Sequence, residues 1–188
     1  MKTFQQAWDK MTSKVELIQV HSEEMEAMWN KCLEFKEPFI VEIGSAHGAS
    51  SIIFAEVARK THGVVHCYDT YPENYYNQDK FGRYAKEQFI KNTEDYVDVL
   101  MLHQASSTEV GFMVLTNYID VAFIDGDHSY EAVQEDCHNI IQLIRKGGYI
   151  AFHDYNNPAF AGVKKAADEQ KNIALVQSVW DLAIFKKL

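Results

Sequence analysis

The chain has 188 residues, of which 47% are hydrophobic, and its formal net charge is −9 at pH 7. This length and composition predict one folded domain with a single core and exclude wholesale disorder. The acidic balance argues against a nucleic-acid partner, because the lysines and arginines are scattered and form no basic stripe. No apolar run approaches the ~18 residues of a membrane span, so no membrane partner is expected.

Three cysteines, Cys32, Cys67 and Cys137, are far apart and odd in number. This spacing matches neither a disulfide framework nor a zinc cluster, and we interpret each cysteine as a small buried hydrophobe. The first residues also lack the apolar segment of a signal peptide. A cytoplasmic location is therefore expected.

Residues 1–37 are predicted to form an N-terminal helical extension. Ser22 is expected to cap its main helix, and Pro38 to stop it, because a residue before proline avoids helical torsions. One apolar helix face is formed by Met25, Met28, Trp29, Cys32 and Leu33.

From residue 38 to residue 188 the pattern changes to strands that alternate with helices. Such alternation predicts an α/β fold with a mostly parallel sheet covered on both faces. The last two strands have a short connection, so they should pair as an antiparallel hairpin at the sheet edge. Lys146-Gly147-Gly148 is expected to end the helix before the fifth strand. The seven strands are predicted at 39–43, 64–68, 97–102, 119–124, 149–152, 173–176 and 180–185.

A glycine-containing turn follows the first predicted strand. Gly44 and Gly48 allow a sharp turn close to a ligand, and the helix that follows offers free N–H groups. The GxxxG spacing differs from the dinucleotide GxGxxG, and no P-loop Lys-Ser/Thr follows. Asp69, at the end of the second strand, stands where an acidic residue can accept hydrogen bonds from ribose hydroxyls. An ordinary turn and a solvent-facing acid are the alternative interpretations.

Ionisable side chains end the fourth and fifth predicted strands. Asp125 and His128 follow the fourth, and His153 and Asp154 end the fifth. If these strands are neighbours, the groups converge at one rim, and converging carboxylates repel unless a cation or proton lies between them. Oxygen ligands with an imidazole suit Mg²⁺, Mn²⁺ or Ca²⁺ better than zinc. Asp127 is expected to hold the start of the next helix, and His153 could simply orient its neighbour.

Together these segments resemble the class I S-adenosylmethionine-dependent methyltransferases. The chain is most similar to the metal-dependent small-molecule O-methyltransferases of the macrocin type, and less similar to the catechol branch. The resemblance covers roughly residues 39–185 and implies a Rossmann-like, doubly wound, seven-stranded domain over 38–188. The motifs that carry it are Phe-Ile-Asp-Gly-Asp-His-Ser-Tyr-Glu at 123–131, Glu-Ile-Gly-Ser-Ala-His-Gly-Ala-Ser at 42–50 and Phe-His-Asp-Tyr at 152–155.

The resemblance implies roles for individual residues. His128 matches the general base of the sugar-modifying branch, and Asp125 and Asp154 match metal ligands, with Mg²⁺ the expected ion. His153, a further metal-ligand position, departs from the carboxylate of that branch. The cofactor S-adenosylmethionine is expected to contact Glu42, Gly44, Ser45, Gly48, Ser50, Asp69, Ala105, Ser106 and Asp125.

The expected activity is methyl transfer to a hydroxyl on a small sugar or aromatic substrate. The aromatic side chains after the second strand are predicted to contact this acceptor: Tyr71, Tyr75, Tyr76, Phe81 and Tyr84. The N-terminal helices either cap this pocket or form a homodimer interface. Alternatives are a non-catalytic cofactor- or metal-binding module and an NAD-linked oxidoreductase on a similar sheet. A nucleic-acid methyltransferase is disfavoured by the negative charge.

Overall fold

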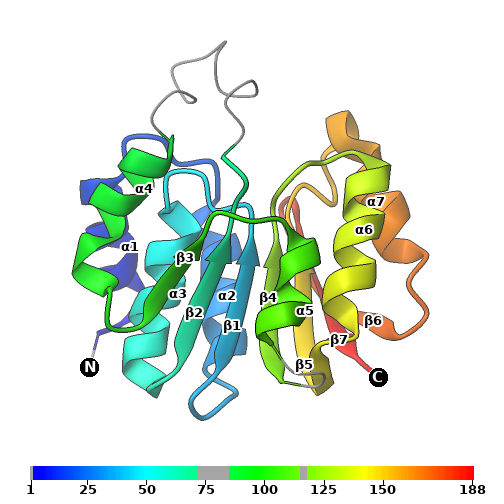
Figure 1. Ribbon diagram of the computed structural model, residues 1–188, viewed down its shortest axis with the longest axis horizontal. Helices are drawn as coiled ribbons and strands as arrows, with labels where there is room; N and C mark the ends of the chain where they lie inside the picture. Colours follow the sequence, from blue (N-terminus) through cyan, green and yellow to red (C-terminus); the bar gives the residue numbers. More distant parts are fainter. Residues whose placement is uncertain (1, 72–84, 115–117) are drawn as a thin grey trace.

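The computed structural model describes residues 2–71, 85–114 and 118–188, apart from the side chains of 112 and 113. Within these ranges seven strands form one sheet in the order β3-β2-β1-β4-β5-β7-β6 (Figure 1). β7 is antiparallel to both of its neighbours, and the other pairs are parallel. The predicted doubly wound α/β fold with a C-terminal antiparallel hairpin is confirmed. The strands are β1 Phe39–Ile43, β2 Val64–Tyr68, β3 Leu100–His103, β4 Ile119–Ile124, β5 Ile144–Phe152, β6 Ile173–Val179 and β7 Leu182–Lys187.

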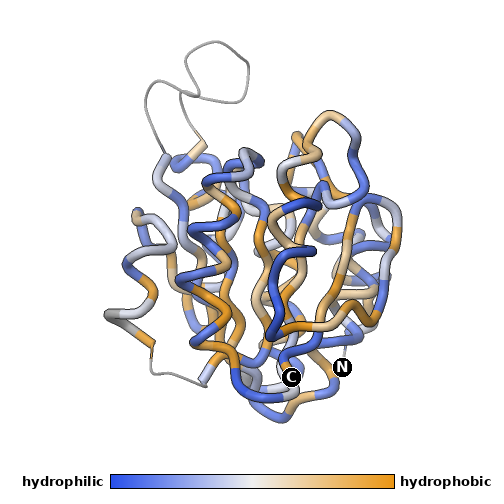
Figure 2. The backbone as a smooth tube through the Cα atoms, turned by 90° about the vertical axis from the view of Figure 1, so that its right-hand side faces the viewer, coloured by the Kyte–Doolittle hydropathy of each residue, from blue (hydrophilic) through white to orange (hydrophobic). Residues whose placement is uncertain are grey.

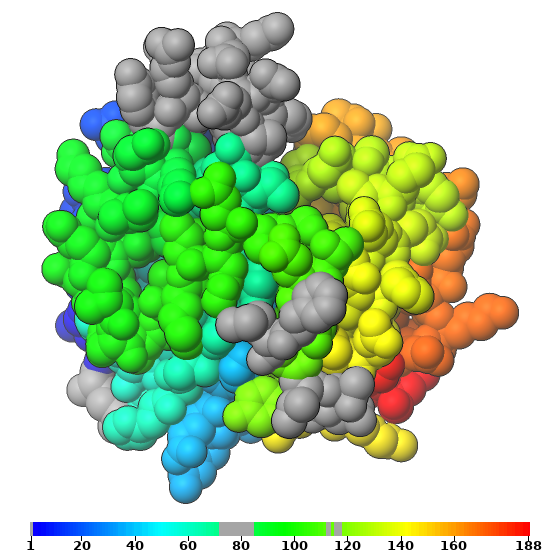
Figure 3. All heavy atoms as spheres, in the orientation of Figure 1, coloured from blue at the N-terminus to red at the C-terminus, as the bar shows by residue number. Residues whose placement is uncertain are grey.

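Helices cover both faces of the sheet. One hydrophobic cluster joins α1, α2, α3 and α4 to one face, and a second joins α5, α6 and α7 to the other. On the face shown in Figure 3, atoms of α5 and α6 lie side by side over the sheet. The helices are α1 Phe4–Lys14, α2 Ser22–Cys32, α3 Ala49–Thr61, α4 Ala85–Thr93, α5 Val110–Met113, α6 Tyr130–Ile141 and α7 Ala161–Asp168, with 3₁₀ turns η1 Glu94–Tyr96, η2 Ser107–Glu109 and η3 Pro158–Phe160.

The central strands are mostly apolar because both of their faces are buried. Successive residues of a strand point to opposite faces, so Ile40 belongs to the first cluster and Val41 to the second. All six residues of β4 are buried. In Figure 2, hydrophobic (orange) stretches of the backbone run through the middle of the molecule. This arrangement leaves the carboxyl ends of β1, β2, β4 and β5 at one edge of the sheet, where polar residues follow.

The predicted end of α6 at Lys146-Gly147-Gly148 is wrong, because α6 ends at Ile141 and β5 already begins at Ile144. The two glycines lie within β5, where the register against β4 shifts between Ile119 and Val121. Gly147 has a φ of 82°, and a Cβ on Gly148 would lie 2.9 Å from the carbonyl oxygen of Asp120. The two glycines therefore accommodate an irregularity in the pairing of β5 with β4, and they do not end a helix.

Other boundaries also differ from the prediction. The third strand starts at Leu100 instead of 97, because a 3₁₀ turn precedes it, and the C-terminal strands reach further along the chain. His21, and not Ser22, is the N-cap residue of α2, and the Oε2 atom of Glu24 accepts a hydrogen bond from its backbone N–H (2.8 Å). The cap therefore depends on a side chain inside the helix, which a search for Ser or Thr overlooks.

The N-terminal helices pack into the main core. Met11 of α1 and Met28 of α2 are fully buried and share a cluster with Phe54 of α3 and with strand residues such as Phe123. The boundary between 1–37 and 38–188 stays a prediction, but α1 and α2 bury their apolar faces against the sheet domain. None of the helices in the described ranges has the length and apolar character to cross a membrane.

Candidate active site

The turn between β1 and α3 passes unusually close to the end of β4. Gly44 has a φ of 82°, and a Cβ at this position would lie 2.1 Å from the carbonyl oxygen of Asp125. Only glycine fits such a contact without moving one of the two chains. The turn is further fixed by a hydrogen bond from the Gly44 N–H to the carbonyl of Tyr68 at 2.8 Å. The ends of β1, β2 and β4 are thereby held together.

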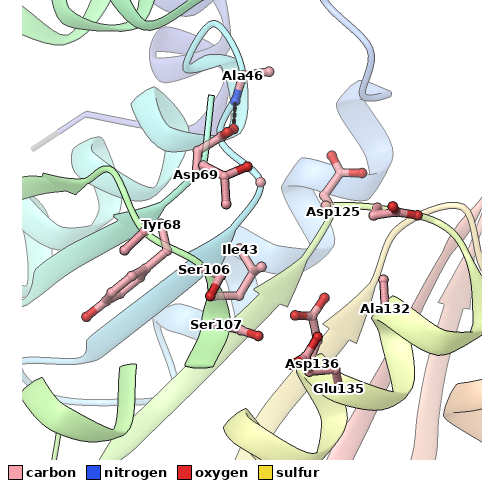
Figure 4. Close-up of a pocket in the computed structure, with 15 residues that line it drawn as sticks. Ile43, Ala46, Tyr68, Asp69, Ser106, Ser107, Asp125, Ala132, Glu135 and Asp136 are labelled. Atoms are coloured by element: carbon pink, nitrogen blue, oxygen red, sulfur yellow. Dashed lines mark hydrogen bonds between the residues drawn. The ribbon is translucent and has the colours of Figure 1, made fainter. Parts of the chain in front are cut away.

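Asp69 at the end of β2 organises this turn. Its Oδ2 atom accepts hydrogen bonds from the N–H groups of Ser45 and Ala46, each at 3.0 Å, and its Oδ1 atom accepts one from the N–H of Tyr71 at 2.8 Å. The bond to Ala46 is drawn in Figure 4. Much of the hydrogen-bonding capacity of the carboxylate is therefore used within the protein, although Asp69 still lines a cavity.

That cavity, called the smaller cavity below, has a volume of about 280 Å³. It is bounded by the ends of β1, β2 and β4, by the loop at 105–107, and by α6. Figure 4 shows Asp69 and Asp125 on the strand side, and Ala132 and Asp136 on the helix side. Five residues of the predicted cofactor set line it: Gly44, Asp69, Ala105, Ser106 and Asp125. Strand-end carboxylates and a glycine turn of this kind suit a nucleoside.

The larger cavity, of about 530 Å³, lies on the other side of the glycine turn. It contains the predicted base His128 together with His153 and Asp154, and Ser45 and Ser50 also line it. The two cavities share Gly44, Ala46, Asp125 and Gly126 as lining residues. A molecule in the smaller cavity could therefore meet one in the larger cavity across the glycine turn.

Asp125, His128 and Asp154 form a cluster in the wall of the larger cavity. The Nε2 atom of His128 lies 3.1 Å from Oδ2 of Asp154 and 3.5 Å from Oδ1 of Asp125. In the described part of the chain this is the group of side chains that could hold a metal ion, with potential ligand atoms within 4.8 Å of one another. The fold thus brings together residues from the ends of β4 and β5, as the sequence predicted. The imidazole of His128 also stacks on Phe160, with ring centroids 4.4 Å apart.

His153 lies beside this cluster and contacts carboxylates through both ring nitrogens. Its Nδ1 atom is 3.2 Å from Oδ1 of Asp125 and 3.2 Å from Oδ2 of Asp154, and its Nε2 atom is 3.2 Å from Oε2 of Glu24. The side chain is therefore held in place by three carboxylates. Its role as a metal ligand stays a prediction, since both nitrogens already face oxygen atoms.

The carboxylates shift the pKa values of both imidazoles. Burial alone would lower the pKa of His128, but the hydrogen bonds and negative charges of Asp125 and Asp154 raise it to about 9. Burial opposes the same effect at His153, where the charge of Asp125 is the largest contribution that raises the pKa, to about 12. The carboxylates therefore favour the protonated form of both imidazoles.

Glu42, Gly48 and Ser50 lie behind the glycine turn. The carboxylate of Glu42 is fully buried and accepts hydrogen bonds from the hydroxyls of Ser50 and Ser51 in the first turn of α3. Gly48 is the N-cap of α3 with a φ of 85°. Neither Glu42 nor Gly48 lines the two cavities. In this structure Glu42 and Gly48 support the turn between β1 and α3. Their predicted contacts with the cofactor stay a prediction.

The predicted acceptor pocket falls mostly outside the described residues, which exclude Tyr75, Tyr76, Phe81 and Tyr84. Tyr71 is buried, and its hydroxyl lies 3.1 Å from Oγ of Ser45 and donates to the carbonyl of Ala46 at 3.3 Å. It therefore supports the glycine turn.

Sequence reasoning missed several residues of both cavities. Asp136 lines the smaller cavity from α6, and burial raises its pKa to about 6. The larger cavity is also lined by Phe160 and by the segment between α1 and α2, including Leu17 and His21. Asp136 occupies a buried helix position, which is unusual for a carboxylate and was the signal available for it. The segment around Leu17 carries no comparable pattern.

Comparisons with known proteins identify the fold and the family. The family model described as a methyltransferase domain matches residues 41–155, more than half of the chain. A curated protein, uncharacterized protein R132 of Acanthamoeba polyphaga mimivirus, is 49% identical over 43 residues, which are 23% of this chain and 20% of that protein. The chain thus matches only a small part of that relative.

Solved structures share the fold at low sequence identity. The SAH-bound methyltransferase PaMTH1 of Podospora anserina is 13% identical with a TM-score of 0.71, covering 98% of this chain and 87% of that one. The SAM-dependent O-methyltransferase TM0748 of Thermotoga maritima is 13% identical with a TM-score of 0.69, covering 97% and 71%. These similarities establish a common architecture, and the match of the family model assigns membership. The chain therefore belongs to the methyltransferase domain family.

Proposed function

We propose that this protein transfers the methyl group of S-adenosylmethionine to a hydroxyl on a small molecule, either a sugar or an aromatic ring. The observation that carries the proposal is the junction of the two cavities at Gly44 and Asp125. One cavity has the strand-end carboxylates that suit a nucleoside, and the other has an imidazole and two carboxylates that suit hydroxyl chemistry.

In this proposal the smaller cavity binds the cofactor. Asp69 would accept hydrogen bonds from the ribose hydroxyls with the lone pairs that the turn leaves free, and the 105–107 loop would border the adenine. The glycine turn would let the methionine part pass toward the larger cavity, because Gly44, which borders both cavities, has no side chain. The methyl group would then face the side of the turn on which His128 lies.

The chemical step is an in-line displacement. The acceptor oxygen forms a bond to the methyl carbon while the carbon–sulfur bond breaks, and the bonding electrons neutralise the sulfonium to give S-adenosylhomocysteine. The hydroxyl proton goes to Nε2 of His128, which must be neutral to accept it. Holding the two reactants in line can contribute on the order of 7–11 kcal/mol to catalysis. Phe160, stacked on His128, would fix the plane of the base.

The donor set fits a divalent cation. Asp125 and Asp154 converge with their carboxylate oxygens near one imidazole, and oxygen-rich sets of this kind suit Mg²⁺ or Mn²⁺. An ion held by these residues would supply positive charge that acidifies a ligating hydroxyl. His128 contacts the same two carboxylates, so Asp125 and Asp154 also influence the protonation of its imidazole.

The test combines a binding and a transfer experiment. Calorimetric titration with S-adenosylhomocysteine and with NAD distinguishes the methyltransferase from an oxidoreductase on a similar sheet. Transfer of labelled methyl groups from S-adenosylmethionine is then measured against nucleotide sugars and against catechols, with and without EDTA. We expect binding of S-adenosylhomocysteine, no binding of NAD, and methyl transfer that EDTA suppresses. Binding without transfer to any hydroxylated substrate would favour the non-catalytic module.

A further inference from the structure

Glu24 is a fully buried carboxylate that lies outside the matched methyltransferase segment. It belongs to the first turn of α2, in the N-terminal helical extension, and has no solvent exposure. Burying a carboxylate is costly unless its oxygens are hydrogen-bonded or paired with a positive charge. The contacts of Glu24 therefore indicate what this residue is for.

Three groups contact the carboxylate of Glu24. The N–H of Asp181, in the turn between β6 and β7, donates to Oε1 at 2.9 Å. The N–H of His21 donates to Oε2 at 2.8 Å, and Nε2 of His153 lies 3.2 Å from the same oxygen. The contacts with His21 and Asp181 fix the helix start and the β6–β7 turn. The third contact reaches His153, which lies in the wall of the larger cavity.

The ring of His153 is the part of that residue which Glu24 can orient. Its backbone is already fixed, because its N–H donates to the carbonyl of Ile124 at 3.0 Å between β4 and β5. On the other side of the ring, Nδ1 is 3.2 Å from Oδ1 of Asp125 and 3.2 Å from Oδ2 of Asp154. A contact at one ring nitrogen thus determines where the other nitrogen points.

We propose that Glu24 is a positioning residue of the active site, which holds the ring of His153 so that its Nδ1 atom keeps Asp125 and Asp154 converged on the larger cavity. Helix α2 then contributes to the active site through Glu24, and the segment between α1 and α2 lines the larger cavity through Leu17 and His21. The consequence for catalysis rests on the proposed function, whereas the orientation of His153 does not.

The primary test is nuclear magnetic resonance of the histidine side chains. Ring nitrogen signals are recorded for the wild type and for Glu24→Ala, Glu24→Gln and Glu26→Ala, and the His153 signals are assigned with His153→Gln. Glu26 lies on the same helix but is exposed, so its variant is the matched control. We expect the His153 signals to move strongly in Glu24→Ala, less in Glu24→Gln, whose amide oxygen can still accept a hydrogen bond, and not in the control. Unchanged His153 signals in Glu24→Ala would overturn the proposal.

The second test measures Mn²⁺ affinity in a double-mutant cycle. Removing a group that orients metal-site residues typically weakens metal binding by about 10–100-fold. We expect this loss in Glu24→Ala, and little further loss when the same change is made in His153→Gln. An equal loss in both backgrounds would show that Glu24 does not act through His153 and would overturn the proposal.

Two further measurements separate the possible failures. Thermal unfolding shows whether Glu24→Ala is folded, and if it is not, Glu24→Gln carries both tests because it keeps the size of the side chain. Affinity for S-adenosylhomocysteine is measured on the wild type, because Asp125, which His153 contacts, also lines the smaller cavity. A wild-type protein that binds none of this compound would overturn the proposed function, and the resonance comparison would still decide the role of Glu24.

Discussion

The Nε2 atom of His128 lies 3.1 Å from Oδ2 of Asp154, so the group proposed as general base is paired with a residue from the neighbouring strand. This pair joins the loop after β4 to the end of β5. It also raises the pKa of His128, because the charged ring is stabilised by the carboxylates more than burial penalises it. Proton acceptance by His128 is therefore tied to the state of Asp154.

Replacement of His128 by alanine should abolish turnover but keep cofactor binding. A general base typically contributes about 10²–10⁴ in rate, and His128 does not line the smaller cavity. The measurement is initial-rate methyl transfer together with the affinity for S-adenosylhomocysteine. His138→Ala, on α6 outside both cavities, is the control and should leave both values unchanged. Full turnover of the His128 variant on its substrate would remove the base assignment.

Replacement of Asp154 by asparagine should weaken Mn²⁺ binding by at least about tenfold. The change removes one of two carboxylate charges, while Asn157, which donates to Oδ1 of Asp154 at 2.7 Å, and the backbone are left in place. Metal affinity is measured by calorimetry with and without S-adenosylhomocysteine. Glu131→Gln removes an exposed charge at the start of α6 and should have no effect. Equal affinities of wild type and Asp154→Asn would contradict the metal site.

Much of the fold was predictable because burial leaves a clear pattern in the sequence. β1 and β4 are buried on both faces, so each is apolar apart from one buried acid, Glu42 in β1 and Asp120 in β4, and each is followed by polar residues. Asp125 and Asp154 could be placed near each other because parallel strands end at the same edge. The convergence of these side chains follows from topology and needs no knowledge of loop conformation.

The remaining features depend on contacts that sequence spacing does not encode. Glu24 reaches His153 across more than a hundred residues, and nothing in the pattern of α2 distinguishes it from the exposed Glu23 and Glu26. The sequence around Gly147 and Gly148 resembles a helix end, but the two glycines lie in β5, where its register against β4 shifts. Both features depend on long-range packing, which the residue type and its local spacing do not reveal.

Replacement of Gly44 by alanine should destabilise the protein strongly. A left-handed conformation costs roughly 1–2 kcal/mol for a residue with a side chain, and the added Cβ would also lie 2.1 Å from the carbonyl oxygen of Asp125. The free energy of unfolding is measured with urea. Gly111→Ala is the matched control, because a Cβ there meets no atom within 4 Å and alanine favours the helix α5. Similar stability of the two variants would argue against the close approach of the two strand ends.

Replacement of Glu42 by glutamine should flatten the dependence of stability on pH. Burial raises the pKa of Glu42 from 4.5 to about 7 in the folded protein. Between these values the folded state binds more protons than the unfolded state, so this group makes stability fall as pH rises from 4.5 toward 7. The contribution is on the order of 3 kcal/mol, since one pKa unit corresponds to about 1.4 kcal/mol.

Urea unfolding at several pH values from 4.5 to 8 measures this contribution. The wild type should lose more stability across the range than Glu42→Gln, whose amide oxygen can still accept a hydrogen bond from Ser50 or Ser51. Glu131→Gln again serves as the control, because its exposed carboxylate should leave the wild-type slope unchanged. Parallel curves for the wild type and Glu42→Gln would mean that Glu42 is ionised in the folded protein at the same pH as in the unfolded chain. The buried carboxyl would then have to be stabilised as a charge by its two serine donors, in spite of its complete burial.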